Sequence, residues 1–216
     1  LYQTDTKEWH SFLSSFDPVP DDENHIFLAL CEASPGVIWA GGFMSGICKI
    51  EKKKGFKISH ISPAAIAGVR PDQYIFDIKK DSGGDIWSGG YHHLKRINLE
   101  TKSLYPGVNS ITTIQEKDTR QMWIGTRMGL YQLDKESGVY QYVDLPIESP
   151  YICALFQRDD GILYIGTRGA GLLVYDINKK KFIHQYRTDN CALISDNIYT
   201  ILPRQDESLL MGTENG

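Results

Sequence analysis

The sequence predicts an all-β protein, a β-propeller of four-stranded antiparallel blades, and three observations support this fold class. A short motif, in which an aromatic or apolar lead residue is followed by x-Gly-Gly or x-Gly-Thr, recurs five times along the 216 residues. Successive leads are 48, 36, 41 and 46 residues apart, and periods of roughly 40–50 residues are typical of propeller blades. No stretch shows helical periodicity, so the repeated unit consists of strands.

The lead residue and the first glycine of each motif are expected to be structural. The lead packs between neighbouring blades, and the glycine lets two backbones approach closely. The leads are Trp39, Trp87, Trp123, Tyr164 and Leu210, and the glycines are Gly41, Gly89, Gly125, Gly166 and Gly212. Because its lead is aliphatic, the fifth copy is the weakest of the set.

The residues before each lead extend the repeat. The positions 12, nine and one before the lead are apolar in every copy. A polar turn such as Asp159-Asp160-Gly161 separates the first apolar run from the motif, because Asp and Gly tolerate the positive φ of hairpin turns. Each unit therefore begins with a hairpin of two strands, A and B. Two further strands, C and D, follow, as at 130–133 and 139–143. A sandwich with accidental internal similarity is the alternative.

The phase of the repeat describes one propeller domain over residues 1–216. Four blades are expected at 17–61, 62–105, 106–143 and 144–187. A fifth is split: residues 1–16 supply strands C and D, and residues 188–216 supply strands A and B. If the five blade equivalents close, the two terminal parts pair as a clasp that removes the exposed sheet edges. The alternative, which we favour, is that they are part of a larger propeller ectodomain.

The composition argues against several classes of function. The net charge is −4 and the basic residues form no face, so nucleic acid is not an expected partner. No apolar run approaches the roughly 18 residues of a membrane-spanning helix, so this segment is not expected to contact a membrane directly. The cysteines lack metal-site spacing, and adjacent strand residues such as His92 and His93 point opposite ways, so we expect no metal and no cofactor. Residue 1 is Leu, which indicates a mature or excised piece.

The motif around Trp123 is part of a longer pattern: Ile-x-x-Ile, a polar turn, apolar-Trp-Ile-Gly-Thr, then Gly-Leu-Tyr-x-Leu-Asp. This pattern closely resembles the two-component regulator propeller repeat, and the similarity covers the whole chain. It is strongest in the Trp123 and Tyr164 units. Gly-Gly replaces Gly-Thr in the first two units, and His92-His93 stands where the family places Gly. These departures put the loop shapes in doubt.

The resemblance implies a function. Repeats of this family build the periplasmic sensor region of hybrid two-component histidine kinases in Gram-negative, glycan-degrading bacteria. The parent protein would span the inner membrane, form a homodimer, bind a glycan fragment outside the cytoplasm and signal to a cytoplasmic histidine kinase, of which this chain contains nothing. The alternative is a protein-interaction scaffold, in which the propeller docks another subunit and binds no small ligand.

Candidate binding residues lie in loops. Antiparallel strands place the B–C and D–A loops on one rim, here called the B–C rim, and binding residues concentrate in such loops. Aromatic faces can stack on sugar rings, and Arg binds carboxylate or sulfate bidentately. The candidates for an oligosaccharide site are Arg127, Arg168, Tyr91, His92, Phe43 and Glu214, among which Arg127 and Arg168 occupy equivalent positions. Exposed loop residues without a common ligand are the alternative interpretation.

An enzymatic function is not expected of this segment. Propellers that hydrolyse glycosides need two carboxylates on the inner strands, at separations of about 5–10 Å. Ten residues before each lead stand Ala29, Asp77, Thr113, Ala154 and Thr200. Asp77 alone cannot act both as acid and as base or nucleophile, so we expect it to form hydrogen bonds within the central channel.

Overall fold

The computed structural model describes residues 2–3, 8–9, 26–43, 46–55, 57–61, 74–97, 102–148 and 150–216. Within these residues every regular element is a β-strand, apart from one 3₁₀ turn, η2 (Lys52–Lys54). The part of the chain that the structure describes is therefore all-β, as the repeat predicts.

Four antiparallel sheets of four strands follow one another along the chain, and in each sheet every strand pairs with the next. The first sheet contains β3 (Ile26–Ser34), β4 (Val37–Phe43), β5 (Ile47–Glu51) and β6 (Lys57–Ile61). The second contains β7 (Ile75–Lys80), β8 (Ile86–Gly90), β9 (Leu94–Ile97) and β10 (Lys102–Tyr105). The third contains β11 (Ile111–Glu116), β12 (Gln121–Thr126), β13 (Gly129–Asp134) and β14 (Tyr140–Val143). The fourth contains β15 (Ile152–Gln157), β16 (Ile162–Thr167), β17 (Leu172–Asp176) and β18 (Lys181–Tyr186).

Two further sheets have two strands each. β1 (Tyr2–Gln3) pairs with β2 (Glu8–Trp9), and β19 (Ile198–Pro203) pairs with β20 (Leu209–Thr213). The two pairs are separate sheets. The described residues of the two terminal parts thus show no pairing with each other. The clasp, which depends on ring closure, stays a prediction, as do closure itself and the blade number.

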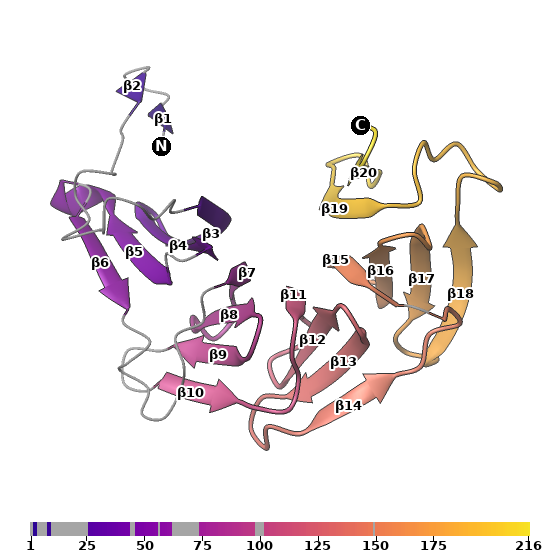
Figure 1. Ribbon diagram of the computed structural model, residues 1–216, viewed down its shortest axis with the longest axis horizontal. Coiled ribbons are helices and arrows are strands. Elements are labelled where there is room, and N and C mark those ends of the chain that lie inside the picture. The colour runs from indigo at the N-terminus through magenta and orange to yellow at the C-terminus, as the bar shows by residue number, and fades with distance from the viewer. Residues whose placement is uncertain are drawn as a thin grey trace.

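The sheets lie side by side along an open arc (Figure 1). The first strands of the sheets, β3, β7, β11, β15 and β19, lie on the inner side of the arc and contact one another in that order. The last strands, β6, β10, β14 and β18, lie on the outer side. This arrangement, with the A strand innermost and the D strand outermost, is propeller-like.

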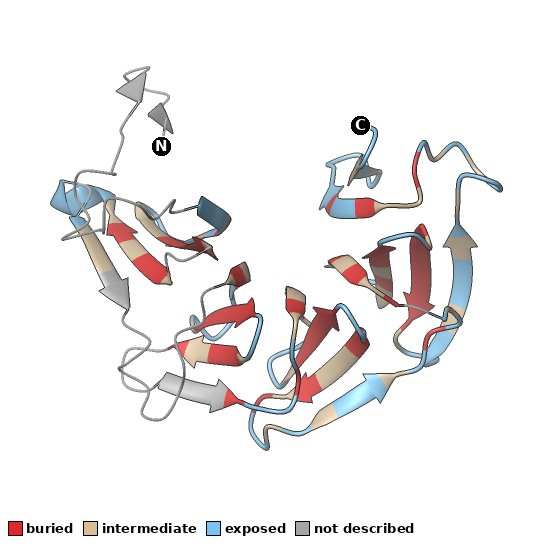
Figure 2. Cartoon of the chain, viewed as in Figure 1, coloured by how far each residue is buried: buried red, intermediate tan, exposed pale blue. Residues whose placement is uncertain are grey.

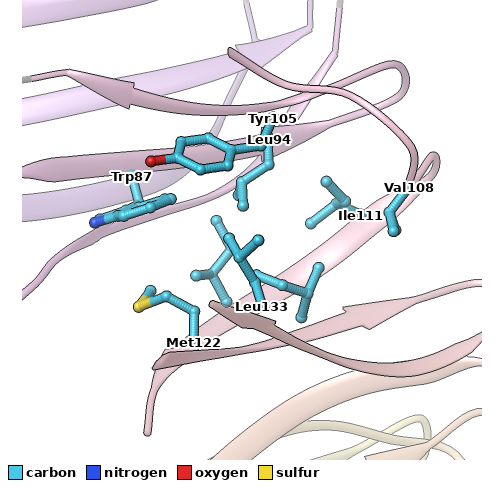
Figure 3. Close-up of a cluster of buried hydrophobic side chains, with 9 residues drawn as sticks. Trp87, Leu94, Tyr105, Val108, Ile111, Met122 and Leu133 are labelled. Carbon is cyan, nitrogen blue, oxygen red and sulfur yellow. The ribbon is translucent and has the colours of Figure 1, made fainter. Parts of the chain in front are cut away.

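The hydrophobic core lies between neighbouring sheets. Buried residues concentrate on the inner and middle strands, whereas β14 and β18 are largely exposed (Figure 2). At the junction of the second and third sheets, side chains from both sheets meet (Figure 3): Trp87, Leu94, Tyr105, Val108, Ile111, Ile114, Met122, Ile124 and Leu133. Burying an apolar side chain of this size contributes about 1.5–3 kcal/mol, so the junctions hold the sheets together.

The first glycine of each of the first four motifs lies against the next sheet. A Cβ on Gly89 would fall 2.3 Å from the Cγ2 atom of Ile111, and one on Gly125 would fall 2.7 Å from that of Ile152. Gly41 and Gly166 meet the equivalent isoleucines of their neighbouring sheets in the same way. Each of these isoleucines stands 12 residues before the next lead. Two positions of the repeat therefore pack on each other across every junction.

The Gly89→Ala substitution is expected to lower the free energy of unfolding by about 1–3 kcal/mol, as overpacking of a filled core does. The added methyl would meet Ile111 and also Ile114, whose Cδ1 atom lies 3.1 Å away. Unfolding by denaturant measures the loss. In an Ile111→Ala background the clashing Cγ2 atom is absent, so the same glycine substitution should cost less. Equal costs in both backgrounds would contradict the packing role.

The second position of the motif shapes the B–C loop differently in Gly-Thr and Gly-Gly copies. The hydroxyl of Thr126 donates to the carbonyl of Gly129 at 2.9 Å and accepts from the N–H of Met128 at 2.9 Å. In a Gly-Gly copy, a Cβ on Gly90 would fall 2.0 Å from the carbonyl oxygen of Tyr74. In the Gly-Gly copies, the second glycine thus lies too close to the backbone at the start of the inner strand of its own sheet to carry any side chain.

Every inner strand carries a register shift at the same place. Ile75 and Asp77 pair with successive residues of β8, so Phe76 is left without a partner in the ladder. The equivalent extra residues are Leu28, Thr112, Cys153 and Tyr199. A β-bulge of this kind re-aims the extra side chain. None of these five side chains is fully buried.

Candidate functional site

A band of residues runs along the B–C rim and links consecutive sheets. Two positions of the repeat build it: the residue immediately before an inner strand and the residue four places after a lead. From Phe43 onward, this rim band consists of Phe43, Tyr74, Tyr91, Ser110, Arg127, Tyr151, Arg168, Asn197 and Glu214.

Backbone contacts hold the rim band together. Phe43 and Tyr74 form a β-bridge from the first sheet to the second. The N–H of Tyr91 donates to the carbonyl of Tyr74 at 3.3 Å, and the N–H of Ser110 donates to that of Tyr91 at 2.9 Å. The N–H of Arg127 then donates to Ser110 at 3.1 Å. The pattern recurs further along, from Arg168 to Tyr151 at 2.9 Å and from Glu214 to Asn197 at 3.3 Å.

Aromatic rings gather at the start of the rim band. The ring centroids of Phe43 and Tyr74 are 4.7 Å apart, and those of Tyr74 and Tyr91 are 5.5 Å apart. The bulge in β7 brings Phe76 to the same group, 6.0 Å from Tyr74 and 6.5 Å from Tyr91. His92 extends the group, with its ring 5.6 Å from Tyr91 and exposed. These rings form a partly exposed aromatic surface.

Arg127 and Arg168 follow the aromatic group along the rim band. The guanidinium of Arg127 lies 5.6 Å from the ring of Phe76, 5.5 Å from Tyr91 and 5.7 Å from Tyr151. The guanidinium of Arg168 lies 5.6 Å from Tyr151. Tyr151 is therefore shared by the two arginines. A cation–π contact positions a guanidinium without neutralising its charge.

The two rim arginines lack acidic partners. Within the described residues, neither Arg127 nor Arg168 has a carboxylate within ion-pair distance. Other arginines are paired: Arg120 with Asp134 at 2.7 Å and Arg187 with Asp196 at 3.2 Å. Both rim arginines are exposed. Two positive charges are thus held among aromatic rings and available to an acidic ligand.

A pocket of about 490 Å³ adjoins Arg168. It is lined by residues of the D–A loop before β15, the B–C loop after β16 and the end of β18, among them Glu148, Arg168, Gln185 and Arg187. The side-chain amide of Gln185 donates to the carbonyl of Ala170 at 2.8 Å and fixes that loop. The pocket extends the rim band outward.

The structure brings most of the predicted site residues together and separates one. Phe43, Tyr91, His92, Arg127 and Arg168 all lie on or beside the rim band, connected through ring contacts. Glu214 lies at the far end of the band, where its carboxylate accepts a hydrogen bond from the side-chain amide of Asn197.

Sequence reasoning missed Tyr74, Phe76 and Tyr151. Tyr74 and Tyr151 occupy the same position of the repeat, 13 residues before a lead. That shared position is the signal that could have revealed them.

Asp77 forms hydrogen bonds between inner strands, as predicted. Its Oδ2 atom accepts from the backbone N–H of Ile114 on β11 at 2.7 Å, and Lys79 Nζ lies 3.6 Å from Oδ1. Burial raises the pKa of Asp77, against the opposing effects of Lys79 and the Ile114 hydrogen bond. The carboxyl group thus ties the second sheet to the third.

The described residues contain neither a candidate metal cluster nor a candidate membrane-spanning helix. No three His, Cys, Asp or Glu side chains in this part of the chain gather as a metal site would require. Among the same residues there is no helix of the length and apolarity needed to cross a membrane.

Comparison with known proteins shows the fold. No protein-family model and no curated protein sequence matches this chain. The extracellular domain of the hybrid two-component system BT4673 from B. thetaiotaomicron superposes with a TM-score of 0.73 at 21% identity, over 90% of this chain and 27% of that chain. The corresponding domain of BT3049 from the same organism gives 0.71 at 20% identity, over 88% and 26%. Virginiamycin B lyase from Staphylococcus aureus, as a catalytically inactive variant with quinupristin, gives 0.73 at 16% identity, over 91% and 66%.

These neighbours share an architecture with the chain. Two are extracellular domains of two-component systems, of which this chain spans 27% and 26% of the length. The third is an enzyme, which shows that the same fold also carries catalysis. A fold can serve several functions, so the residues of the site, rather than the fold, indicate the function of this chain.

Proposed function

We propose that this chain is a ligand-sensing part of an extracytoplasmic sensor region, and that it binds an acidic glycan fragment on the B–C rim. The observation that carries the proposal is the rim band, in which the guanidinium groups of Arg127 and Arg168 both lie against the ring of Tyr151, without carboxylate partners among the described residues. The extracellular two-component domains among the structural neighbours support the sensor context.

The chemistry of the rim band suits a charged sugar. Aromatic faces such as those of Tyr74 and Tyr91 pack against the C–H groups of a pyranose ring. A guanidinium binds a carboxylate or sulfate through two parallel hydrogen bonds. The aromatic group lies at the start of the band, and Tyr151 contacts both arginines that follow, so an oligosaccharide could place sugar rings on the tyrosines and its acidic groups on Arg127 and Arg168.

Signalling requires that the ligand distinguish two arrangements of the sensor. A ligand shifts an equilibrium only by the difference in its affinity for the two states. In the proposed parent protein, an inner-membrane homodimer with the propeller in the periplasm, binding would favour one packing of the dimer. The cytoplasmic histidine kinase would respond to that packing. The chain would then be part of a larger propeller ectodomain.

A non-catalytic role fits the inner strands. Asp77 is the one acidic residue at the channel position ten residues before the leads, and it bonds to the backbone of Ile114. No second carboxylate at that position could complete an acid and base pair of the kind a glycoside hydrolase uses.

Arg127→Ala is expected to weaken binding of an acidic oligosaccharide by about 1.5–3 kcal/mol, roughly 10- to 150-fold, because a charged hydrogen bond is lost. Isothermal titration with uronate-containing or sulfated oligosaccharides, beside neutral ones of the same length, measures the change. Arg168→Ala should behave similarly. Arg120→Ala is the matched control, since Arg120 lies in an A–B turn on the opposite rim and pairs with Asp134. Unchanged affinity in both rim variants would remove the site assignment.

A protein-interaction scaffold is the second candidate, and exposed apolar residues at the two ends of the arc favour it. On β3, Ile26, Leu28 and Leu30 are 50%, 51% and 66% exposed, and Leu210 on β20 is 56% exposed. Large apolar patches mark contact surfaces. Absence of heat with every oligosaccharide of the panel, together with self-association in solution, would favour the scaffold over the sensor.

A further inference from the structure

A groove of about 530 Å³ opens between the third and fourth sheets, away from the rim band. Residues of β12, β13 and β14 line one wall, and residues of β17 and β18 line the other. Its charged residues are Lys117, Lys180 and Asp144. Gln132, Gln141, Tyr175 and Phe182 also line it. Its volume falls within the range of ~300–1,000 Å³ that is typical of small-molecule sites.

Lys117 is a partly buried cation with neutral partners. Its Nζ atom donates to the side-chain carbonyl of Gln121 at 2.6 Å and to that of Gln132 at 3.0 Å, and lies 5.2 Å from the Trp123 ring. Within the described residues no carboxylate lies within ion-pair distance of it. Burial lowers the pKa of Lys117, and neighbouring Lys180 lowers it further, against the opposing effect of Asp118. A bound anion would therefore stabilise the charged ammonium group of Lys117.

The preceding junction shows how the fold neutralises such a cation. Between the second and third sheets, Lys135 Nζ lies 3.1 Å from Asp81 Oδ2 and 2.6 Å from Glu116 Oε1. The three groups form a closed ionic cluster, so the protein itself supplies the anions at this junction.

The repeat relates the two junctions position by position. Lys117 stands six residues before its lead, as Asp81 does, and Gln157 stands seven before its lead, as Glu116 does. Ile177 follows the aspartate that ends β17, as Lys135 follows the one that ends β13. Both carboxylates are thus absent from the junction of the third and fourth sheets. The cation equivalent to Lys135 is absent too, and Lys117 stands at the position of Asp81, beside an open groove.

We propose that this groove is a second binding site, for a sugar acid whose carboxylate contacts Lys117 and whose ring packs against Tyr175 and Phe182. Lys180 is a second cation on the same groove, and the glutamines offer amide groups to ring hydroxyls. Aromatic walls favour a ring over a simple anion. The site is independent of the rim band, because none of its lining residues belongs to that band.

An NMR titration of the chain with D-glucuronate tests the proposal, with D-glucose as the neutral counterpart. The host carries Arg127→Ala and Arg168→Ala, so that binding at the rim cannot produce the signal. Glucuronate should shift the side-chain amide signals of Gln132 and Gln141 and the indole N–H of Trp123 in a saturable way. Glucose should bind at least tenfold more weakly. Equal binding of both sugars, or no saturable shift at these signals, would overturn the proposal.

Two variants assign the contact. Lys117→Met should weaken glucuronate binding at least tenfold with little effect on glucose. Lys180→Gln, at an exposed position, should weaken it several-fold, whereas its neighbour Lys181→Gln, also exposed and outside the groove, should not. Identical affinity in the Lys180 and Lys181 variants, or unchanged affinity in a folded Lys117 variant, would contradict the assignment.

Discussion

Replacing Lys135 with alanine is expected to lower the free energy of unfolding by about 3–5 kcal/mol, the usual cost of removing one partner from a buried ion pair. The Lys135 side chain is 6% exposed, and that of Asp81 is 3% exposed. Asp81 also accepts a hydrogen bond from Trp87 Nε1 at 2.9 Å, so it cannot turn towards solvent without losing that bond. The variant would keep two carboxylates, of Asp81 and Glu116, without their shared cation.

Chemical denaturation followed by circular dichroism measures this loss. Arg158→Ala is the control, because the side chains of Arg158 and its partner Asp160 are 41% and 48% exposed, and a surface pair of this kind contributes about 1 kcal/mol or less. Similar small losses in the two variants would show that the cluster at the junction is not energetically important.

The loss should depend on pH. Burial alone would raise the pKa of Asp81, but hydrogen bonds from Trp87 and Lys135 outweigh it, and the pKa is lowered. A lowered folded-state pKa means that Asp81 stabilises the fold above the unfolded value of about 3.9 and loses this contribution as pH falls through the folded value. In Lys135→Ala the Asp81 carboxylate lacks its cation, and protonation would remove its uncompensated negative charge. The deficit of the variant should therefore shrink below about pH 4. A deficit that stays constant down to pH 3 would contradict this account.

Replacing Trp87 with alanine is expected to cost about 3–5 kcal/mol, as truncation of a buried aromatic residue does. Trp87 is 0% exposed, and its ring lies 5.2 Å from that of Tyr105 within the junction of the second and third sheets. Leu210 holds the same position of the repeat but is 56% exposed. Leu210→Ala should therefore cost about 0.5 kcal/mol or less.

The pair of lead variants separates burial from repeat position. Unfolding by heat and by denaturant should rank Trp87→Ala and Trp123→Ala together as the most costly, because Trp123 is 2% exposed. A loss for Leu210→Ala as large as that for Trp87→Ala would mean that the exposed face of β20 is covered in solution.

Much of the fold could be predicted from the sequence because each junction between sheets depends on residues at repeated positions in two successive copies. The lead, the first glycine and the isoleucine 12 residues before the next lead are parts of one contact, as Gly89 and Ile111 show. Whether the two terminal parts pair as a clasp is not specified by the repeat. Pairing between distant ends of a chain depends on how far the arc curves, and no local pattern contains that curvature.

The candidate site could be predicted in part. Arg127 and Arg168 stand at equivalent loop positions, and the repeat alone identifies them. Phe76 was missed because a bulge leaves the apolar pattern of its strand unchanged while it re-aims one side chain. Glu214 was grouped with the arginines because of its position in the repeat. In the structure its carboxylate accepts a hydrogen bond from the side-chain amide of Asn197.

Charged residues in turns were the least predictable. Asp81 and Lys135 both lie in hairpin turns, where charged side chains are typically solvated. Lysine has a long flexible stem, and here it crosses from one sheet to the next and buries its ammonium group. Lys117, from the turn between β11 and β12, reaches a groove instead. The same residue type thus has two outcomes, which depend on the opposing sheet.

The repeated bulge in the inner strands places one residue of each sheet outside the strand ladder. The residues on either side of it, such as Ile75 and Asp77, make the contacts that define the junctions, whereas the extra residue between them makes none in the ladder. Phe76, Thr112, Cys153 and Tyr199 differ in size and polarity within one architecture. The bulge therefore gives each sheet one position that can vary without a change of architecture, and a polar residue there can also bond across a junction, as Thr112 does when its hydroxyl donates to the carbonyl of Ile152 at 2.6 Å.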